Sequence, residues 1–427
     1  MRGIKIVGFF IRIFKKLLNN NGLVSLIDQS IVSAVNFITG FFLARFLSIE
    51  EYGAFTLTLS ILFFLNGIQN ALFITPFTII SKDYQEHRKK YMGETTVIYF
   101  LFIVVIILLM IFVYYIFPMG YIYRNVLIGV IITILFIQGQ EFFRRVLFSN
   151  LLFRKALIND SLCYGVRVIG LIILLALGEL NLLNTFLVMA FSGLLGMIIG
   201  YLDTKIYIQF QNIDIKSSLK INWNFGKWLL GNNIFAWVNT QIYIFVASSF
   251  LGPSAPARLS ATQNLLNPTN ILMQGLQNYY LPLGVEGYKE KGIGFLKQFI
   301  HKYLFIISSI LIFYSLLIDL NASKLLYLLY GNKYSGSEYL LFLWSIAYIV
   351  TGFSRPYMLG LNILKKPRTG FFTYMIISIL SIMLVVPIIK LLGAEGMIYW
   401  SIFTGIIIFL INFIIYKREI KIIEEGK

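Results

Sequence analysis

Apolar runs of about 20 residues, almost free of charge, recur along the whole of this 427-residue sequence. A run of that length is what an α-helix needs to cross a hydrocarbon layer about 30 Å thick. A helix satisfies its own backbone hydrogen bonds in lipid, whereas the strands of a membrane barrel would be shorter and would alternate. Charged residues make up only 13% of the chain, against about 25% in soluble domains. The sequence therefore predicts an all-α polytopic membrane protein.

Twelve transmembrane helices are expected, in two lobes of six helices around a central cavity. Their expected bounds are 24–46, 54–80, 96–117, 125–148, 161–178, 182–202, 228–250, 259–283, 303–320, 339–360, 371–390 and 396–416. The corresponding regions are a cytoplasmic amphipathic N-terminal segment (1–22), an N-lobe (23–210), a cytoplasmic linker (211–227), a C-lobe (228–416) and a cytoplasmic tail (417–427).

The net charge of +17 raises the question of a nucleic-acid partner. Most Lys and Arg residues, however, lie at the two termini and in every second connection between spans. Such asymmetry in short loops sets orientation by the positive-inside rule. We therefore expect both termini in the cytoplasm and no nucleic-acid partner. With one cysteine and two histidines, neither a metal nor another cofactor is expected, although a coupling ion, proton or sodium, is compatible with a transporter.

The two halves of the chain resemble each other at several points. The sequence FLSI at 46–49 has a counterpart in FLGP at 250–253, and GIQN at 67–70 has one in GLQN at 275–278. Between these two pairs the second half gains four residues, which is about one helical turn. The order of the matches favours two parallel repeats related by an axis along the membrane normal.

The segment ARFLSIEEYG at 44–53 resembles the A-R-x-L-G-P-x-E-Y-G turn of the polysaccharide flippases. The segments GIQNAL at 67–72 and QEFFRR at 140–145 are similar to the same family. These flippases belong to the multidrug/oligosaccharidyl-lipid/polysaccharide exporter (MOP) superfamily. Ser48 and Ile49 replace the Gly-Pro pair of the family pattern, and that pair is present at 252–253.

The resemblance implies a function and a location. The implied function is transport of undecaprenyl-pyrophosphate-linked oligosaccharide repeats from the cytoplasmic to the outer leaflet, for O-antigen (lipopolysaccharide) or capsule assembly. The implied location is the bacterial inner membrane. The implied partners are the lipid-linked oligosaccharide, membrane lipids, a polysaccharide polymerase and a chain-length regulator. A transporter of this kind is not an enzyme.

Arginine suits the pyrophosphate because its planar fork donates parallel hydrogen bonds and stays charged. An arginine inside the bilayer is costly, which makes it a functional candidate. The candidates are Arg167 and Arg355 within spans, Arg45 and Arg258 near the outer mouth, and Arg144 and Arg145 near the inner end of the fourth span. The competing interpretations are snorkelling for the first pair, helix-end charge for the second and positive-inside anchoring for the third.

Two acidic residues and one row of amides complete the predicted sites. Asp28 and Glu141 are candidates for ion coupling, with a salt bridge to an arginine as the alternative. The eighth span carries amides with helical spacing, and Pro268 is expected to bend it. These amides share one face, which predicts a path for sugar hydroxyls, with interhelical hydrogen bonding as the alternative. The four amides are Asn267, Asn270, Gln274 and Gln277.

Three other functions compete with the flippase interpretation. A polymerase or ligase of the same pathway would carry a large external loop, and the longest external stretch here, about 321–338, is short. A drug/cation antiporter of the same superfamily should favour acidic residues for its cationic substrates. A lipid II flippase is the third alternative, and such proteins usually have additional spans.

Overall fold

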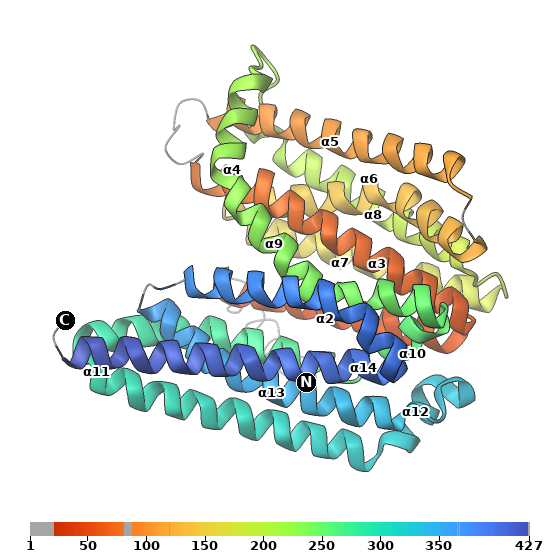
Figure 1. Ribbon diagram of the computed structural model, residues 1–427. Helices are drawn as coiled ribbons and strands as arrows, with labels where there is room; N and C mark the ends of the chain where they lie inside the picture. Colours follow the sequence, from red (N-terminus) through yellow and green to blue (C-terminus); the bar gives the residue numbers. More distant parts are fainter. Residues whose placement is uncertain (1–20, 81–87, 119, 365, 367, 426–427) are drawn as a thin grey trace, which may run out of the picture. The chain divides into compact units, whose positions relative to one another are not determined.

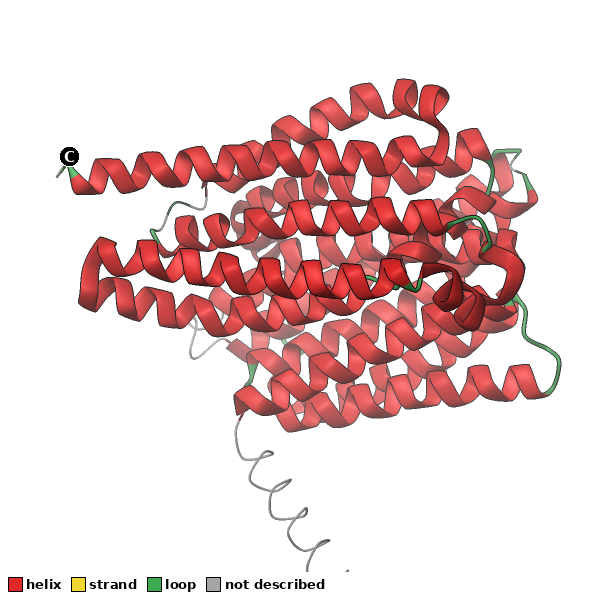
Figure 2. Ribbon diagram, turned by 90° about the horizontal axis from the view of Figure 1, so that it is seen from below, coloured by secondary structure: helices red, strands yellow, loops and turns green. Residues whose placement is uncertain are grey.

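The computed structural model describes residues 21–80, 88–118, 120–364, 366 and 368–425. Within these residues every regular element is a helix (Figures 1 and 2). The expected amphipathic segment at 1–22 lies almost entirely outside them. The helices are α2 (Asn21–Phe46), α3 (Ile49–Gln69), the π-helix η1 (Asn70–Ile74), α4 (Thr75–Ile80), α5 (Arg88–Ile116), α6 (Tyr121–Ser149), α7 (Phe153–Ala176), α8 (Leu182–Thr204), η2 (Lys205–Tyr207), α9 (Ile215–Leu251), α10 (Ser254–Asn264), α11 (Asn267–Leu320), α12 (Ala322–Tyr330), η3 (Gly331–Tyr334), α13 (Glu338–Ile363) and α14 (Arg368–Glu424).

The internal contacts divide the chain into two compact units. Among the described residues, the first unit contains 21–39 and 58–234, and the second contains 40–57 and 235–425. Helices α2, α3 and α9 therefore contribute residues to both units. This division differs from the expected lobes, 23–210 and 228–416, because the α2–α3 turn packs within the second unit and the start of α9 within the first.

Four long helices form most of the first unit. Helix α8 packs against α6 and α7, and α5 packs against α6 (Figure 1). Buried apolar side chains of α5 and α6, together with those of α3, η1 and α4, form one core, in which the rings of Tyr99 and Phe142 stack with their centroids 4.6 Å apart. Buried aromatic rings of this size supply much of the apolar contact that holds helices together.

In the second unit α13 packs against both α11 and α14. Helices α11 and α14 each consist of two arms, because the backbone reverses at Gly292 (φ 70°) in α11 and at Gly393 (φ 61°) in α14. Positive φ is accessible to glycine at little cost. In Figure 1 the two arms of α11 lie antiparallel.

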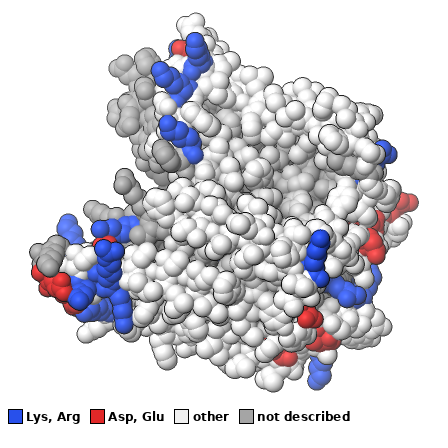
Figure 3. Space-filling view, viewed as in Figure 1, with Lys and Arg blue, Asp and Glu red and all other residues white. Residues whose placement is uncertain are grey.

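Nine helices of the described chain are long and apolar enough to cross a membrane. This number counts each of α11 and α14 once. When the two arms of α14 are counted separately, and α13 and the segment formed by α10 with the first arm of α11 are added, twelve helical segments lie at the twelve predicted positions. The protein is thus an all-α polytopic membrane protein. In Figure 3 the charged side chains gather at the helix ends of each unit, with uncharged surface between them.

Two local interactions define the turn at 44–53. Ser48 caps α3: its hydroxyl accepts from the Glu51 amide at 3.1 Å, and its own amide donates to the Glu51 carboxylate at 3.2 Å. This reciprocal arrangement is a capping box, which satisfies two backbone donors at the start of α3. A Cβ on Gly53 would lie 2.0 Å from the carbonyl oxygen of Pro253. The turn after α2 and the turn after α9, which the internal repeat pairs, therefore touch each other, and only glycine fits at position 53.

The expected linker at 211–227 is largely helical, since α9 begins at Ile215. The buried carboxylate of Glu94 on α5 holds this region. It accepts from the Asp214 amide at 2.8 Å and from the hydroxyl of Ser218. The first turns of α9 are therefore anchored to α5, within the first unit.

Candidate functional site

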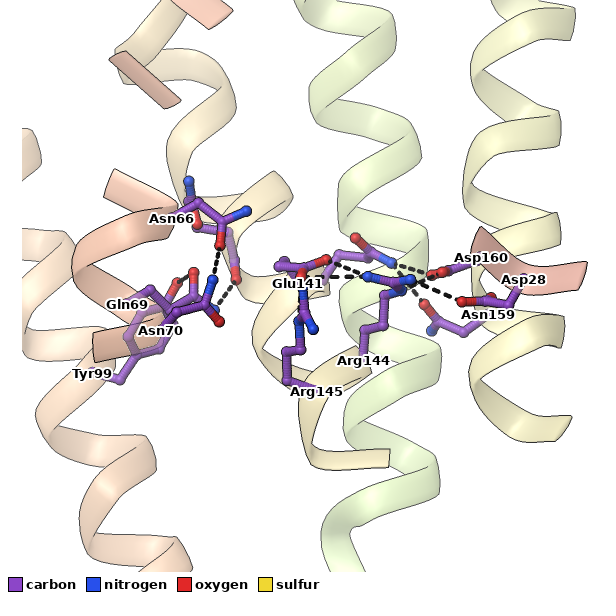
Figure 4. A network of polar contacts seen from close by, with 12 residues as sticks. Asp28, Asn66, Gln69, Asn70, Tyr99, Glu141, Arg144, Arg145, Asn159 and Asp160 are labelled. Atoms are coloured by element: carbon purple, nitrogen blue, oxygen red, sulfur yellow. Dashed lines mark hydrogen bonds and ion pairs between the residues drawn. The ribbon is translucent and has the colours of Figure 1, made fainter. Parts of the chain in front are cut away.

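A buried cluster of charges lies on α6 in the first unit (Figure 4). Arg144 is 3% exposed, and each of its three nitrogens faces a carboxylate. One terminal nitrogen lies 2.8 Å from Asp28 on α2, the other lies 3.1 Å from Glu141, and Nε donates to Asp160 on α7. Arg145 also pairs with Glu141, at 2.7 Å. Three helices are thus joined through one guanidinium.

Amide side chains extend this cluster. Gln140 donates to Asp160 at 2.7 Å and to Asn159 at 3.1 Å, and Asn159 donates to the Gly196 carbonyl at 2.6 Å. Buried charges are costly unless they are paired and their remaining hydrogen-bonding capacity is satisfied. The arrangement gives that compensation to Arg144. The salt-bridge alternative for Asp28 and Glu141 is the geometry observed.

A second polar group of the first unit surrounds the π-helix η1. Tyr99 donates to Gln69 at 3.1 Å, and Asn70 donates to Asn66 at 2.8 Å (Figure 4). Gln138 on α6 donates to the carbonyl of Leu62 at 2.8 Å. A π-helix widens the backbone locally and is frequent at functional sites.

Arg167 lies deep in α7 and is 6% exposed. Its guanidinium carbon is 4.7 Å from the centroid of the Tyr164 ring, and one nitrogen reaches Asn36 at 3.5 Å. The first contact is a cation–π interaction, while the second is at the limit of a hydrogen bond. Its Nε is buried and has no partner among the described residues. Arg167 is therefore less fully compensated than Arg144.

In the second unit two of the four predicted amides, Asn267 and Asn270, form a connected row with Tyr348. Asn267 donates to Asn264 at 2.9 Å, and Tyr348 on α13 donates to Asn267 at 3.0 Å. Asn270 donates to the same Tyr348 hydroxyl at 3.2 Å, and Arg355 donates to the Asn270 oxygen at 3.3 Å. The row thus ends at a cation.

The predicted eighth span consists of two helices, and the four predicted amides all lie in the second, α11. Helix α10 ends at Asn264 and α11 begins at Asn267, so the break precedes Pro268, which occupies the first turn of α11. Proline is well accommodated there because its missing N–H has no helical partner in any case. The interruption falls where the second repeat has its four additional residues. Beyond it, Gln274 is exposed and Gln277 is half-buried.

Arg355 differs from Arg144 in its surroundings. It is half-buried in α13, eight residues before the helix ends, or about 12 Å at 1.5 Å per residue. Its electrostatic neighbours are the hydroxyl-bearing side chains Tyr303, Tyr348 and Tyr374. No carboxylate of the described chain forms an ion pair with it. The acidic residues of the second unit lie at or near helix ends: Glu50, Glu51, Glu286, Glu290, Asp319, Glu338, Glu395, Glu419, Glu424 and Glu425.

The two arginines expected near the outer mouth occupy different environments. Arg45 donates to the carbonyls of Leu328 and Leu329, the latter at 2.9 Å, near the end of α12. Lys333 donates to the carbonyls of Arg45 and Leu47, both at 2.7 Å, and burial lowers the pKa of its ammonium group. Arg258 is exposed on α10. The donors of Arg45 are therefore engaged by backbone, whereas Arg258 is accessible.

Comparison with solved structures identifies the fold. An inward-facing multidrug resistance MATE family transporter of the MOP superfamily matches with a TM-score of 0.72 at 13% identity, over 94% of this chain and 99% of that one. A mutant of the Vibrio cholerae MATE transporter VcmN gives 0.65 at 14%, over 95% and 97%. A Pyrococcus furiosus MOP transporter, described as having a binding pocket of reversed polarity, gives 0.60 at 13%, over 96% of each chain. The fold is that of MOP-superfamily transporters.

A family model assigns the chain more narrowly than the fold comparison does. The family model described as polysaccharide biosynthesis protein matches residues 18–278, and the chain belongs to this family. No curated protein matches the sequence.

Sequence reasoning missed two central residues. The predicted fifth span begins at 161 and therefore excludes Asp160. In the structure α7 begins at Phe153, so Asp160 lies within the helix. Its position seven residues before Arg167 on one helical face would have revealed it. Tyr348, which bridges two asparagines, gave no signal because tyrosine is common throughout this chain.

Proposed function

We propose that this protein is a flippase for undecaprenyl-pyrophosphate-linked oligosaccharide repeat units, which it moves from the cytoplasmic to the outer leaflet of the bacterial inner membrane. Membership of the polysaccharide biosynthesis family supports a role in the assembly of a surface polysaccharide such as O-antigen or capsule. In this role it would act with a polysaccharide polymerase and a chain-length regulator, both termini would lie in the cytoplasm, and the protein itself would catalyse no reaction.

The observation that carries the proposal is the amide and tyrosine row that ends at Arg355. Amides and phenols offer donors and acceptors at once, which suits sugar hydroxyls. A cation without an acidic partner suits a phosphate anion. A hydrophobic cation would find no counter-charge in this row and would meet the positive charge of Arg355. The same reasoning favours Arg355 over Arg144 as the anion ligand, because every nitrogen of Arg144 already faces a carboxylate.

The experiment compares Arg355→Lys with Arg355→Ala in a strain that lacks its own flippase. The lysine variant should keep much of the surface polysaccharide, and the alanine variant should lose at least tenfold at equal protein level. Lys324→Ala, an exposed charge on α12, is the matched control and should behave as the parent. Full activity of Arg355→Ala would refute the assignment. Export of a cationic dye by the parent would instead favour the antiporter alternative, and rescue of a lipid II flippase mutant would favour that alternative.

Ion coupling is proposed for the buried cluster of the first unit. Protonation of Asp28, or binding of sodium beside it, would remove or weaken one of the three carboxylate contacts that hold Arg144. Such a change in a paired buried charge is large enough to bias a conformational equilibrium. Asp28→Asn should then make transport independent of an imposed proton or sodium gradient. A variant that still follows the gradient would rule out this residue and leave Glu141 as the candidate.

A further inference from the structure

The first unit contains an apolar pocket that has no part in the sites described above. Its volume is about 490 Å³, within the range of about 300–1,000 Å³ that is typical of ligand sites. Helices α5, α6 and α8 line it, together with Phe210, which follows η2. The lining side chains include Phe100, Val104, Phe143, Met197 and Tyr201.

Helices α6 and α8 pack closely against each other at the base of the pocket. A Cβ on Gly139 of α6 would lie 2.4 Å from the Met197 sulfur, and one on Gly200 of α8 would lie 2.6 Å from Phe143. The helices therefore approach closely beneath the pocket. On the side of the pocket away from the helix contacts, Leu101, Val104 and Ile198 are about half exposed. The pocket therefore opens on the surface that faces lipid.

Two lysines lie at one end of this pocket. Lys89 shares a face of α5 with Thr96 and Phe100, at i, i+7 and i+11, and Lys205 follows Tyr201 by one turn. The Gln209 amide donates to the Lys89 carbonyl at 3.0 Å, which joins the segment after η2 to the start of α5. Both lysines are exposed, and neither forms an ion pair with a described residue.

We infer that this pocket binds an anionic phospholipid, with an acyl chain in the pocket and the headgroup phosphate at Lys89 and Lys205. The arrangement of charge above an apolar groove is complementary to such a lipid, and basic pockets between transmembrane helices bind anionic headgroups. A groove of this volume encloses one acyl chain but not a long polyprenyl tail. The inference does not depend on the proposed function.

The test is thermal unfolding of the full-length protein in detergent, titrated with dioleoyl phosphatidylglycerol, dioleoyl phosphatidylethanolamine or undecaprenyl phosphate. Phosphatidylglycerol should raise the Tm, and phosphatidylethanolamine should not. Lys89→Gln and Lys205→Gln should each weaken phosphatidylglycerol binding about fivefold, since a basic residue near an anionic surface contributes about 1 kcal/mol. The matched charge control is Lys302→Gln in the second unit, which should change nothing.

The pocket itself is tested by Ile198→Trp, which places an indole at its open side. This variant should abolish the Tm rise, whereas Ile169→Trp, on a lipid-facing position of α7 outside the pocket, should keep it. Equal Tm rises with both phospholipids would overturn the inference. So would a response to undecaprenyl phosphate alone, which would assign the pocket to the tail of a transported lipid. Neither result bears on transport, which is measured separately.

Discussion

Arg144 and Arg355 are the most informative pair of residues in the molecule, because the two units treat a buried cation in opposite ways. In the first unit three carboxylates surround Arg144. In the second unit Arg355 has an amide at 3.3 Å and phenols around it. A compensated cation stabilises helix packing, whereas a cation that lacks an acid retains its capacity to attract an anion. The difference separates a structural charge from a candidate ligand-binding charge.

The largest expected effect is on stability and comes from Arg144→Ala. The change leaves the buried carboxylates of Asp28 and Asp160 without their cation, while Glu141 keeps Arg145. Breaking a buried ion pair costs about 3–5 kcal/mol. The Tm in detergent should fall steeply. Arg355→Ala should lower it little, because no ion pair is broken. Equal losses in the two variants would remove the distinction between the two cations.

The second prediction gives Arg355 an acidic partner of the kind that Arg144 already has. Asn270→Asp places a carboxylate where the amide oxygen lies 3.3 Å from Arg355. The new ion pair should leave the Tm unchanged or higher and should lower transport of the anionic substrate about tenfold, which is about 1.4 kcal/mol. Asn270→Leu, which removes the amide without adding charge, should have a smaller effect on transport. If the aspartate variant transports normally, Arg355 does not hold the anion.

A third prediction concerns the hydroxyl that joins the amide row. Tyr348→Phe removes a group that contacts both Asn267 and Asn270, at 3.0 and 3.2 Å. The free energy of unfolding should decrease by about 1 kcal/mol, the usual value of a neutral hydrogen bond. Tyr327→Phe on exposed α12 is the control. A larger loss of transport than of stability would show that the row contacts substrate.

The smallest effect is expected at Arg145, whose side chain is 39% exposed. An exposed ion pair contributes about 0–1 kcal/mol, so Arg145→Ala should change the Tm only slightly. High salt should reduce that difference further. A loss as large as that of Arg144→Ala would mean that the ion cluster depends on both arginines.

The sequence predicted the helical segments well, because lipid imposes both the length and the apolar composition of a span. It could not predict which charges pair. Arg144 meets Asp28 and Asp160 across three helices, and such contacts depend on packing rather than on spacing along one helix. The break between α10 and α11 was also unpredicted: Pro268 gave the right region, but the helix ends one turn earlier.

The two glycine reversals, at Gly292 and Gly393, bear on how the chain enters the membrane during synthesis. A helical hairpin with a single glycine at its tip carries almost no polar loop, so little hydrated backbone has to be translocated. The tips differ in their number of basic residues: Lys289 and Lys291 precede the first and Lys297 follows it, whereas Lys390 is the basic residue beside the second. By the positive-inside rule the basic tip resists translocation. We therefore expect the turn at Gly292 to stay on the cytoplasmic side of the bilayer and the turn at Gly393 to be translocated.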